Sequence, residues 1–227
     1  MNPDILFEDN HLLVVVKPRN MPIMADDSKD MDLQTAIKAW LKEKYDKPGN
    51  VYLGIVHRLD RPVGGVTVFA KTSKAASRLS EQIRDQETGK VYRTVVHGIP
   101  SNTKDRLRHF LKKDSETRNV RCVSQNANGA KEALLDYVVL AHESHMSMLR
   151  VQLQTGRPHQ IRVQMAEIGH PIVGDARYGQ NTEPGTSIAL WCTSMEISHP
   201  VTGERMRFVC DPPDIWPWNV FPKIREK

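Results

Sequence analysis

The sequence predicts an α+β fold, with a mainly antiparallel, mixed β-sheet flanked by helices. Short runs of β-branched or alternating apolar residues recur along the chain between turn residues, as expected of strands joined by hairpins. Three segments with the apolar spacing of an amphipathic helix fall irregularly among these strands, which is typical of α+β proteins. A chain of 227 residues can bury a core in one large domain or two small lobes. We expect a single domain over residues 1–227.

Strands are expected where short apolar runs are bounded by Gly, Pro, Asn or Asp. The first two form a hairpin over residues 5–18, in which the apolar runs flank a polar turn. The runs at 133–140 and 148–153 are expected to pair in the same way. The other strands are expected, in chain order, at residues 66–71, 90–97, 120–123, 188–197 and 204–210.

Helices are expected where apolar residues recur every three or four positions. The first covers residues 33–45, with Asp32 as its N-cap. The second covers residues 73–86, with Ser73 as its N-cap. The third is short, over residues 159–168, and follows a proline that suits a first helical turn.

The charge balance favours a polyanionic partner. Lys and Arg number 32 against 27 acidic residues, which gives a net charge of +5 and a sequence pI near 9.1. Such a surplus attracts nucleic acid, because phosphate contacts release counterions. The charges are spread along the chain, so folding must assemble any nucleic-acid surface. The densest charged stretch, residues 101–118, is expected to be an exposed, mobile insertion.

Composition also indicates the cellular compartment of the protein. The sequence has no run of 18 apolar residues and no signal-peptide pattern at its start, so we expect no membrane span and no export. The three cysteines Cys122, Cys192 and Cys210 are an odd number without a Cys-x-x-Cys pair. This argues against a disulfide framework or a zinc site and favours the reducing cytoplasm.

The first candidate site is a strand-to-turn segment that carries one carboxylate, Asp60, among His57, Arg58 and Arg61. Nearby cations favour the ionised carboxylate, so Asp60 could act as a base or nucleophile at neutral pH. An ordinary turn with a salt-bridged aspartate is an equally good interpretation of these residues alone.

The second candidate site lies where a strand turns through Thr155-Gly156 into the third helix. The turn and the first helical turns carry Arg157, His159 and Arg162. A helix start offers free N–H groups and a positive dipole end, and arginines add forked donors for carboxylate or phosphate. Taken alone, the residues favour a capped surface helix with solvated charges.

Both segments resemble motifs of the RluA-type pseudouridine synthases. The His-Arg-Leu-Asp sequence at residues 57–60 resembles the active-site motif of this family. Residues 155–162 are similar to its Thr-Gly-Arg-Thr-His-Gln-Ile-Arg motif, with Pro158 in place of the second threonine. Further similarities at residues 90–98, 169–179 and 199–204 extend the resemblance over about residues 5–213. Departures are Val63-Gly64-Gly65 for Thr-Ser-Gly, and Trp191-Cys192 for His-Ala.

The resemblance implies a pseudouridine synthase fold with a central RNA-binding cleft, and an enzyme that isomerises uridine in ribosomal or transfer RNA. It implies that Asp60 is the catalytic residue, that Arg162 pairs with it, and that Tyr92 stacks on the target base. Arg58 would fill the space left by the flipped uridine. His57, Arg157 and His159 are further candidates for RNA binding.

The implied isomerisation needs neither a cofactor nor a metal, and we expect none. Because the first strand of the catalytic domain begins near Ile5, we also expect no separate N-terminal S4-like RNA-binding domain.

Two other interpretations remain open at this stage. One is a non-catalytic RNA-binding protein that retains the fold. The other is a metal-assisted or two-carboxylate hydrolase, for which the possible metal ligands are His57, His159, His170, Asp60 and Asp175. Near the C-terminal end, Trp216 and Trp218 either stack on RNA or pack back on the core.

Overall fold

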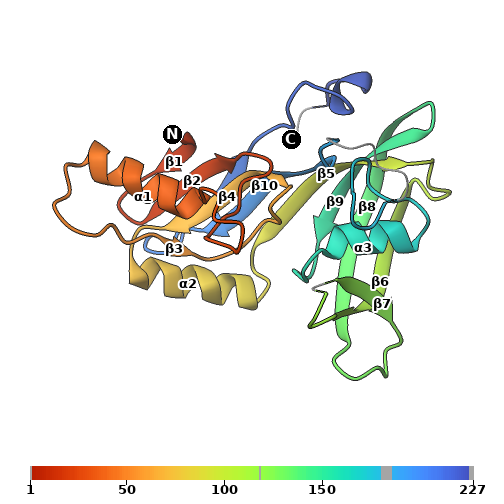
Figure 1. Ribbon diagram of the computed structural model, residues 1–227, viewed down its shortest axis with the longest axis horizontal. Helices are drawn as coiled ribbons and strands as arrows, with labels where there is room; N and C mark the ends of the chain where they lie inside the picture. The colour runs from red at the N-terminus through yellow and green to blue at the C-terminus, as the bar shows by residue number, and fades with distance from the viewer. Residues whose placement is uncertain (1, 118, 180–185, 225–227) are drawn as a thin grey trace. The chain divides into compact units, whose positions relative to one another are not determined.

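The computed structural model describes residues 2–117, 119–179 and 186–224, and it confirms the α+β class (Figure 1). Its contacts divide the chain into two compact units. Among the described residues, unit 1 comprises residues 2–89 and 192–211, and unit 2 comprises the remainder. Both units are therefore built from segments that are far apart in the sequence. Whether the whole chain forms one domain stays a prediction.

Unit 1 is built on a sheet whose strand order is β1-β2-β4-β10, with β3 paired to β4 and β11 paired to β10. These strands are β1 (Asp4–Glu8), β2 (Leu12–Lys17), β3 (Gly54–Ile55), β4 (Gly64–Ala70), β10 (Leu190–Ser198) and β11 (Arg205–Val209). The predicted N-terminal hairpin is confirmed, since β1 pairs with β2 in antiparallel register. Every residue of β4 is buried, so this strand forms the centre of the unit 1 core.

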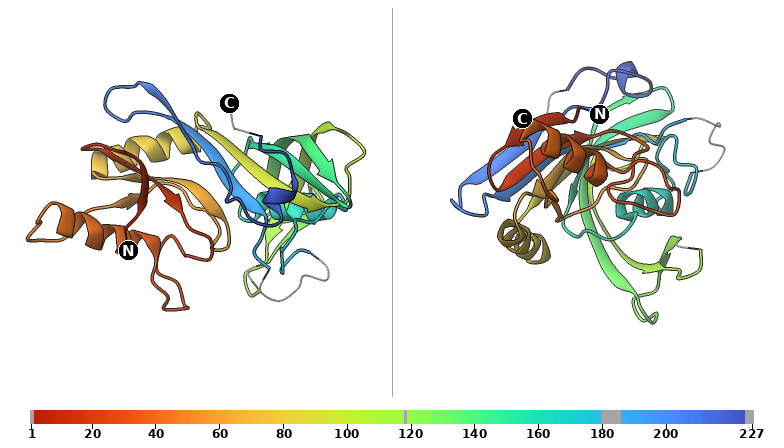
Figure 2. Two further views of the ribbon diagram at one scale, coloured as in Figure 1. Left: turned by 90° about the horizontal axis from the view of Figure 1, so that it is seen from above. Right: turned by 60° about the vertical axis from the view of Figure 1, so that its left-hand side comes forward.

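Two helices complete unit 1, α1 (Leu33–Lys44) and α2 (Ser73–Arg84). They lie on opposite sides of its sheet, as the view from above shows (Figure 2). Asp32 caps α1 as predicted, because its carboxylate accepts the Thr35 N–H at 2.9 Å. The predicted cap of α2 is wrong by one residue. Thr72 is the N-cap, with its hydroxyl 3.2 Å from the Ala75 nitrogen, and Ser73 is the first helical residue.

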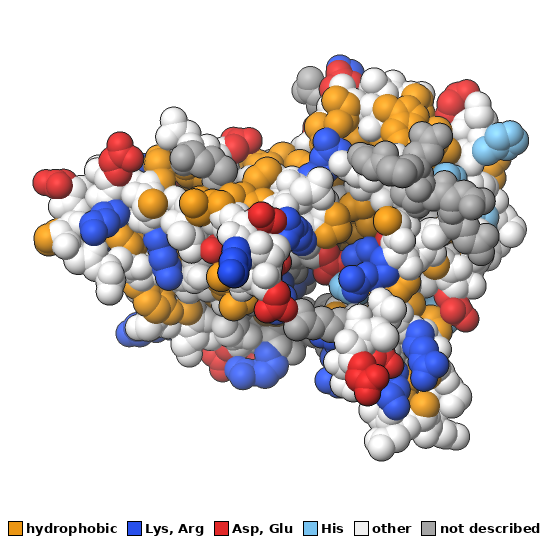
Figure 3. Space-filling view, viewed as in Figure 1, with side chains coloured by type: hydrophobic (Ala, Val, Ile, Leu, Met, Phe, Trp, Pro, Cys, Tyr) orange, Lys and Arg blue, Asp and Glu red, His pale blue; other side chains and the backbone are white. Residues whose placement is uncertain are grey.

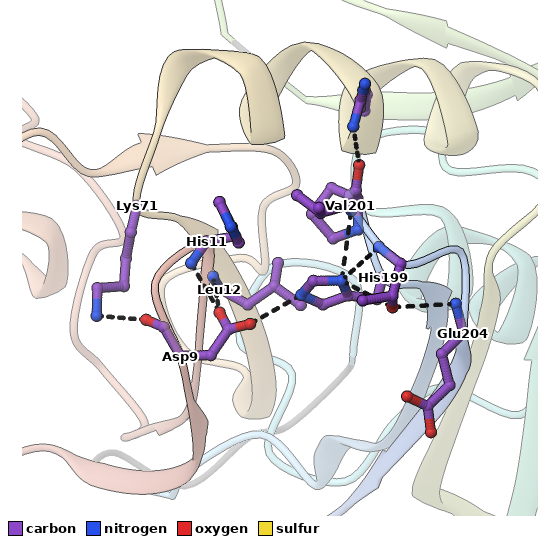
Figure 4. Close-up of polar contacts among 10 residues, drawn as sticks. Asp9, His11, Leu12, Lys71, His199, Val201 and Glu204 are labelled. Atoms are coloured by element: carbon purple, nitrogen blue, oxygen red, sulfur yellow. Dashed lines mark hydrogen bonds and ion pairs between the residues drawn. The ribbon is translucent and has the colours of Figure 1, made fainter.

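A buried histidine joins two turns of unit 1 that are distant in sequence (Figure 4). His199 Nε2 lies 2.8 Å from an Asp9 carboxylate oxygen, while its Nδ1 accepts the backbone N–H groups of Val201 and Thr202. The ring therefore carries its proton on Nε2 and donates it to Asp9. The other Asp9 oxygen accepts the backbone N–H groups of residues 11 and 12. The β1–β2 turn is thereby tied to the β10–β11 turn.

Unit 2 contains antiparallel strands in the order β5-β9-β8-β6-β7. Its strands are β5 (Gly89–His97), β6 (Lys104–Lys113), β7 (Val120–Val123), β8 (Lys131–Glu143) and β9 (Met146–Leu153). One face is covered by α3 (Gln160–Glu167), which packs Val163 against Leu111, Val120 and Ala133. The predicted pairing of residues 133–140 with 148–153 is confirmed by the β8–β9 register.

The predicted mobile insertion at residues 101–118 is wrong, because β6 occupies its centre; residue 118 lies outside the described residues. The buried side chains of Leu107 and Leu111 alternate with exposed basic ones, as in a strand with one core face. Ion pairs Arg106–Asp136 and Arg108–Glu132 further link β6 to β8. The high charge density of this segment obscured the alternation of buried and exposed residues that is typical of a strand.

The C-terminal segment of unit 2 contains a short 3₁₀ helix, η1 (Trp218–Val220). Trp218 is buried, whereas Trp216 is 51% exposed. Packing on the core is therefore confirmed for Trp218, whereas Trp216 does not pack in this way. Across the described part of the chain, no helix is long and apolar enough to cross a membrane.

Candidate active site

Asp60 lies on a tight turn of unit 1 between β3 and β4. Its backbone carbonyl accepts the Val63 N–H at 3.0 Å. The side chains of Leu59 and Val63 are buried, at 6% and 2% exposure, while Asp60 is only partly buried. The turn is thus anchored in the core on both sides of a carboxylate that solvent can reach.

A fully buried lysine, Lys17, stabilises this turn through hydrogen bonds to its backbone. Lys17 Nζ donates to the carbonyl oxygens of Pro18, Arg61 and Val63 at 2.9, 2.9 and 2.7 Å. Three acceptors require all three hydrogens of an ammonium group. Burial lowers the pKa of Lys17 to about 7, while the negative charge of Asp60 acts to raise it. The negative charge of Asp60 therefore favours the ammonium form of Lys17.

Lys17 is not among the residues predicted from the sequence, although the sequence contains a signal for it. A lysine that closes a continuous apolar strand and precedes proline has no solvent-facing side on which to place its charge. Lysine is almost never fully buried without partners. Such a position therefore indicates a buried acceptor or carboxylate nearby.

Replacing Lys17 by Met is expected to lower the free energy of unfolding by about 2–5 kcal/mol, because three carbonyl groups around this fully buried side chain lose their donor. Any activity that depends on Asp60 is expected to fall as well, since the Asp60 turn loses its support. Chemical denaturation and turnover measure the two effects. The matched control is Lys42→Met on the exposed side of α1, which should change neither. Unchanged stability in Lys17→Met would contradict the role of the buried ammonium.

The Val63-Gly64-Gly65 segment has a clear packing role, and only its first two residues depart from the family's Thr-Ser-Gly. Gly65 has a φ of +118°, and a Cβ there would lie 2.2 Å from the Cys192 carbonyl oxygen. Only glycine fits both the backbone conformation and this close approach. Val63 instead contributes a buried side chain and a carbonyl acceptor for Lys17. The turn is therefore held by backbone groups and apolar packing.

The other candidates of unit 1 differ in exposure. His57 is 8% exposed, and its Nε2 accepts the Val68 N–H of β4 at 2.9 Å. Arg58 is exposed. Arg61 forms ion pairs with Asp26 and Asp30 in the loop before α1. Roles of His57 and Arg58 in RNA binding stay predictions.

In unit 2, the turn before α3 is fixed to β8 by a buried glutamine. Gln160 Oε1 accepts from the Thr155 hydroxyl at 2.8 Å and from the Arg157 N–H at 3.0 Å, while its Nε2 donates to the Leu134 carbonyl. Arg157 Nε donates to the Glu132 carbonyl at 2.9 Å. These hydrogen bonds fix the position at which α3 begins.

Arg162, the predicted partner of Asp60, forms a bidentate ion pair inside unit 2 with Asp175. Its Nε and Nη2 donate to the two carboxylate oxygens at 2.8 and 2.7 Å. Both side chains are buried, at 7% and 0% exposure. The guanidinium also lies 5.1 Å from the centre of the Tyr178 ring. Pairing of Arg162 with Asp60 of unit 1 stays a prediction.

Tyr178 extends this cluster to the start of α3. Its hydroxyl accepts the Val120 N–H at 3.0 Å and lies 2.6 Å from His159 Nδ1. Burial raises the pKa of Tyr178 above its usual value, so the phenol stays neutral at physiological pH. The similarity of residues 169–179 to the family predicted neither the contact of Tyr178 with His159 nor the pairing of Asp175 with Arg162. The backbone N–H groups of residues 177 and 178 donate to Asp175, which fixes that carboxylate for Arg162.

Tyr92 lies on β5 of unit 2, opposite Val151 of β9, and is 7% exposed. Its predicted stacking on a base stays a prediction. Within residues 2–117, 119–179 and 186–224, no group of three or more His, Cys, Asp or Glu side chains is placed to hold a metal ion.

Comparison with known proteins identifies the family. A family model described as RNA pseudouridylate synthase matches residues 11–167. The ribosomal large subunit pseudouridine synthase D of Zymomonas mobilis is 32% identical over 221 residues, covering 92% of this chain and 69% of that protein. The uncharacterized RNA pseudouridine synthase YlyB of Bacillus subtilis is 32% identical over 216 residues, covering 94% of this chain and 70% of that protein.

Solved structures show the same fold. Human RNA pseudouridylate synthase domain containing 4 matches with a TM-score of 0.78 at 20% identity, covering 92% of this chain and 88% of that one. Human RNA pseudouridylate synthase domain containing 1 matches with a TM-score of 0.76 at 25% identity, covering 96% and 86%. The predicted fold is confirmed. The chain belongs to the RNA pseudouridylate synthase family, as its resemblance to the RluA-type members predicts, and it is an isomerase that forms pseudouridine in RNA.

Proposed function

We propose that this enzyme isomerises specific uridines of ribosomal RNA, with Asp60 as the catalytic carboxylate. The observation that carries the assignment of Asp60 is its place on a core-anchored turn whose Arg61 and Val63 carbonyls accept hydrogen bonds from the buried ammonium of Lys17. Ribosomal RNA is favoured over transfer RNA because similar proteins from Zymomonas mobilis and Yersinia pestis are named large-subunit synthases. The free cysteines favour a cytoplasmic location.

The reaction breaks the bond from N1 of uracil to C1′ of ribose and forms a bond from C5 to C1′. The proton at C5 is lost and N1 gains one, so atoms and electrons balance without an external oxidant or reductant. Asp60 either attacks C1′ or removes the C2′ proton to give a glycal. Both routes use the ionised carboxylate, and the Lys17 ammonium supplies a nearby positive charge. Arg162 adds a second positive charge in this proposal. No cofactor enters either route.

Access to the target requires that the uridine leave its stack, at a cost of a few kcal/mol. Arg58 is exposed next to the Asp60 turn, so its planar guanidinium can occupy the vacated space. Tyr92, which is 7% exposed, is the aromatic residue proposed to stack on the extruded base. His57, Arg157 and His159 complete the proposed set of residues that bind or position RNA.

Purified enzyme is expected to form pseudouridine in transcripts of large-subunit ribosomal RNA and not in a pool of unmodified transfer RNA. Mass-spectrometric mapping of both RNAs after incubation measures this. Mapping of total cellular RNA with and without the gene locates the uridine. Modification of the transfer RNA pool alone would overturn the ribosomal assignment. Tight RNA binding without turnover on either RNA would favour the non-catalytic alternative.

A further inference from the structure

Unit 2 has a sheet face that α3 does not cover. Cross-strand pairs such as Lys112 with Arg121, and Arg106 with Asp136, place alternate residues of β6 to β9 on one side. We call this side the outer face. It consists of Lys104, Arg106, Arg108, Phe110, Lys112, Arg121, Val123, Glu132, Leu134, Asp136, Val138, Arg150 and Gln152.

The two faces of this sheet differ sharply in burial. The side beneath α3 carries Leu107, Leu111, Val120 and Ala133, none more than 6% exposed. Every residue of the outer face is exposed or only partly buried. Figure 3 views unit 2 from the α3 side, where basic and acidic side chains lie intermixed at the β6–β7 end, so the outer face is turned away from the viewer. The outer face is open to a partner.

The outer face is strongly basic. It carries six Lys or Arg residues and two acids, a surplus of four positive charges, whereas the entire chain has a surplus of five. Both acids, Glu132 and Asp136, pair with exposed arginines of β6, and such exposed pairs contribute little to stability. Phe110 adds an aromatic ring, with the Arg108 guanidinium 5.4 Å from its centre.

The shape of this surface selects the kind of partner. Four neighbouring strands give a width of about 15 Å, and the basic run along β6 is about 27 Å long. A flat array of Lys and Arg of this size contacts several backbone phosphates without reading base edges. We propose that the outer face is a second RNA-contact surface, which binds the phosphate backbone of the substrate RNA in addition to the candidate active site. This proposal rests on RNA being the substrate.

The test reverses three charges of the outer face in one variant, Lys104→Glu, Lys112→Glu and Arg121→Glu. Lys112 and Arg121 face each other across the strands, so a like-charged pair replaces a like-charged pair and the fold should tolerate the change. The matched control reverses three exposed charges of unit 1, Lys42→Glu, Lys74→Glu and Arg84→Glu, and has the same net charge. Circular dichroism checks that both variants fold.

Two probes are used, a transcript of large-subunit ribosomal RNA several hundred nucleotides long and a short stem-loop that contains the target uridine. For the long transcript, the outer-face variant is expected to bind at least about 10-fold more weakly. Its slope of log affinity against log salt should fall by about 2 to 3, since each lost phosphate contact removes roughly 0.7–0.9. The control variant should keep the parent slope within about 1, and turnover of the short stem-loop should stay at the parent level in both variants.

An unchanged slope in the outer-face variant would overturn the proposal, as would an equal loss in the control, which would indicate a general effect of net charge. Binding of the parent to vesicles with anionic lipid, together with an unchanged RNA slope, would assign the face to a membrane instead. If the parent forms no pseudouridine but its RNA binding depends on the outer face, the proposed function fails and this proposal stands. If turnover is normal but reversing the charges of the outer face leaves RNA binding unchanged, this proposal fails and the proposed function stands.

Discussion

Replacement of Asp60 by Asn is expected to lower pseudouridine formation by more than about 1,000-fold, while the fold and the RNA affinity persist. Asparagine has nearly the shape of aspartate but cannot ionise, so it can neither attack C1′ nor take a proton from C2′. A loss of this size corresponds to about 4 kcal/mol of transition-state stabilisation. Single-turnover measurements with excess enzyme isolate the chemical step from RNA binding.

Asp46→Asn is the matched control for this experiment. Asp46 is exposed in the same unit, and its left-handed backbone, with φ of 45°, is one that asparagine also adopts. The control should turn over at the parent rate. Residual activity of Asp60→Asn above about a thousandth of the parent would remove Asp60 from its proposed catalytic role.

Replacement of Arg162 by Met is expected to lower the free energy of unfolding by about 3–5 kcal/mol. The loss arises because Asp175, which is 1% exposed, would remain as a buried charge without its bidentate partner. Equilibrium denaturation measures this change. The matched surface pair is Arg106–Asp136, whose arginine side chain is 67% exposed. Arg106→Met should change stability by less than about 1 kcal/mol.

A double variant separates the structural role of Arg162 from its proposed catalytic one. Arg162→Met combined with Asp175→Leu removes both buried charges, so its stability should exceed that of Arg162→Met alone. If Arg162 also serves Asp60, the double variant should fold and yet turn over at least about 100-fold more slowly than the parent. A stable double variant with parental turnover would show that Arg162 serves only Asp175.

Elements with a strong periodic signal could be predicted from the sequence. The apolar runs around residue 9 and the helical stripe after Asp32 matched β1, β2 and α1 closely. By contrast, β6 was missed because its period of two consists mainly of charges, with Leu107 and Leu111 as the buried members. Charge density suggested mobility, although cross-strand pairing with β8 decides the structure.

The candidate site was only partly predictable for a related reason. The motif residues are contiguous in the sequence, so Asp60 and Arg162 could be nominated from local pattern and resemblance. The groups that hold them are not contiguous with them. Lys17 reaches the Asp60 turn across more than forty residues, and Asp175 reaches Arg162 from beyond α3. Such partners depend on tertiary contacts, which no short window of sequence contains.

The interleaving of the two units has a consequence for biosynthesis. Strand β4 lies between β2 and β10, yet β10 and β11 are encoded after nearly all of unit 2. A nascent chain therefore cannot close unit 1 until residues 192–211 have left the ribosome. Until then part of one edge of β4, a strand whose residues are all buried in the folded unit, lacks its partner strand, and such unpaired edges are prone to aggregation. The hydrogen bond between Asp9 and His199 is therefore one of the last contacts of unit 1 to form during synthesis.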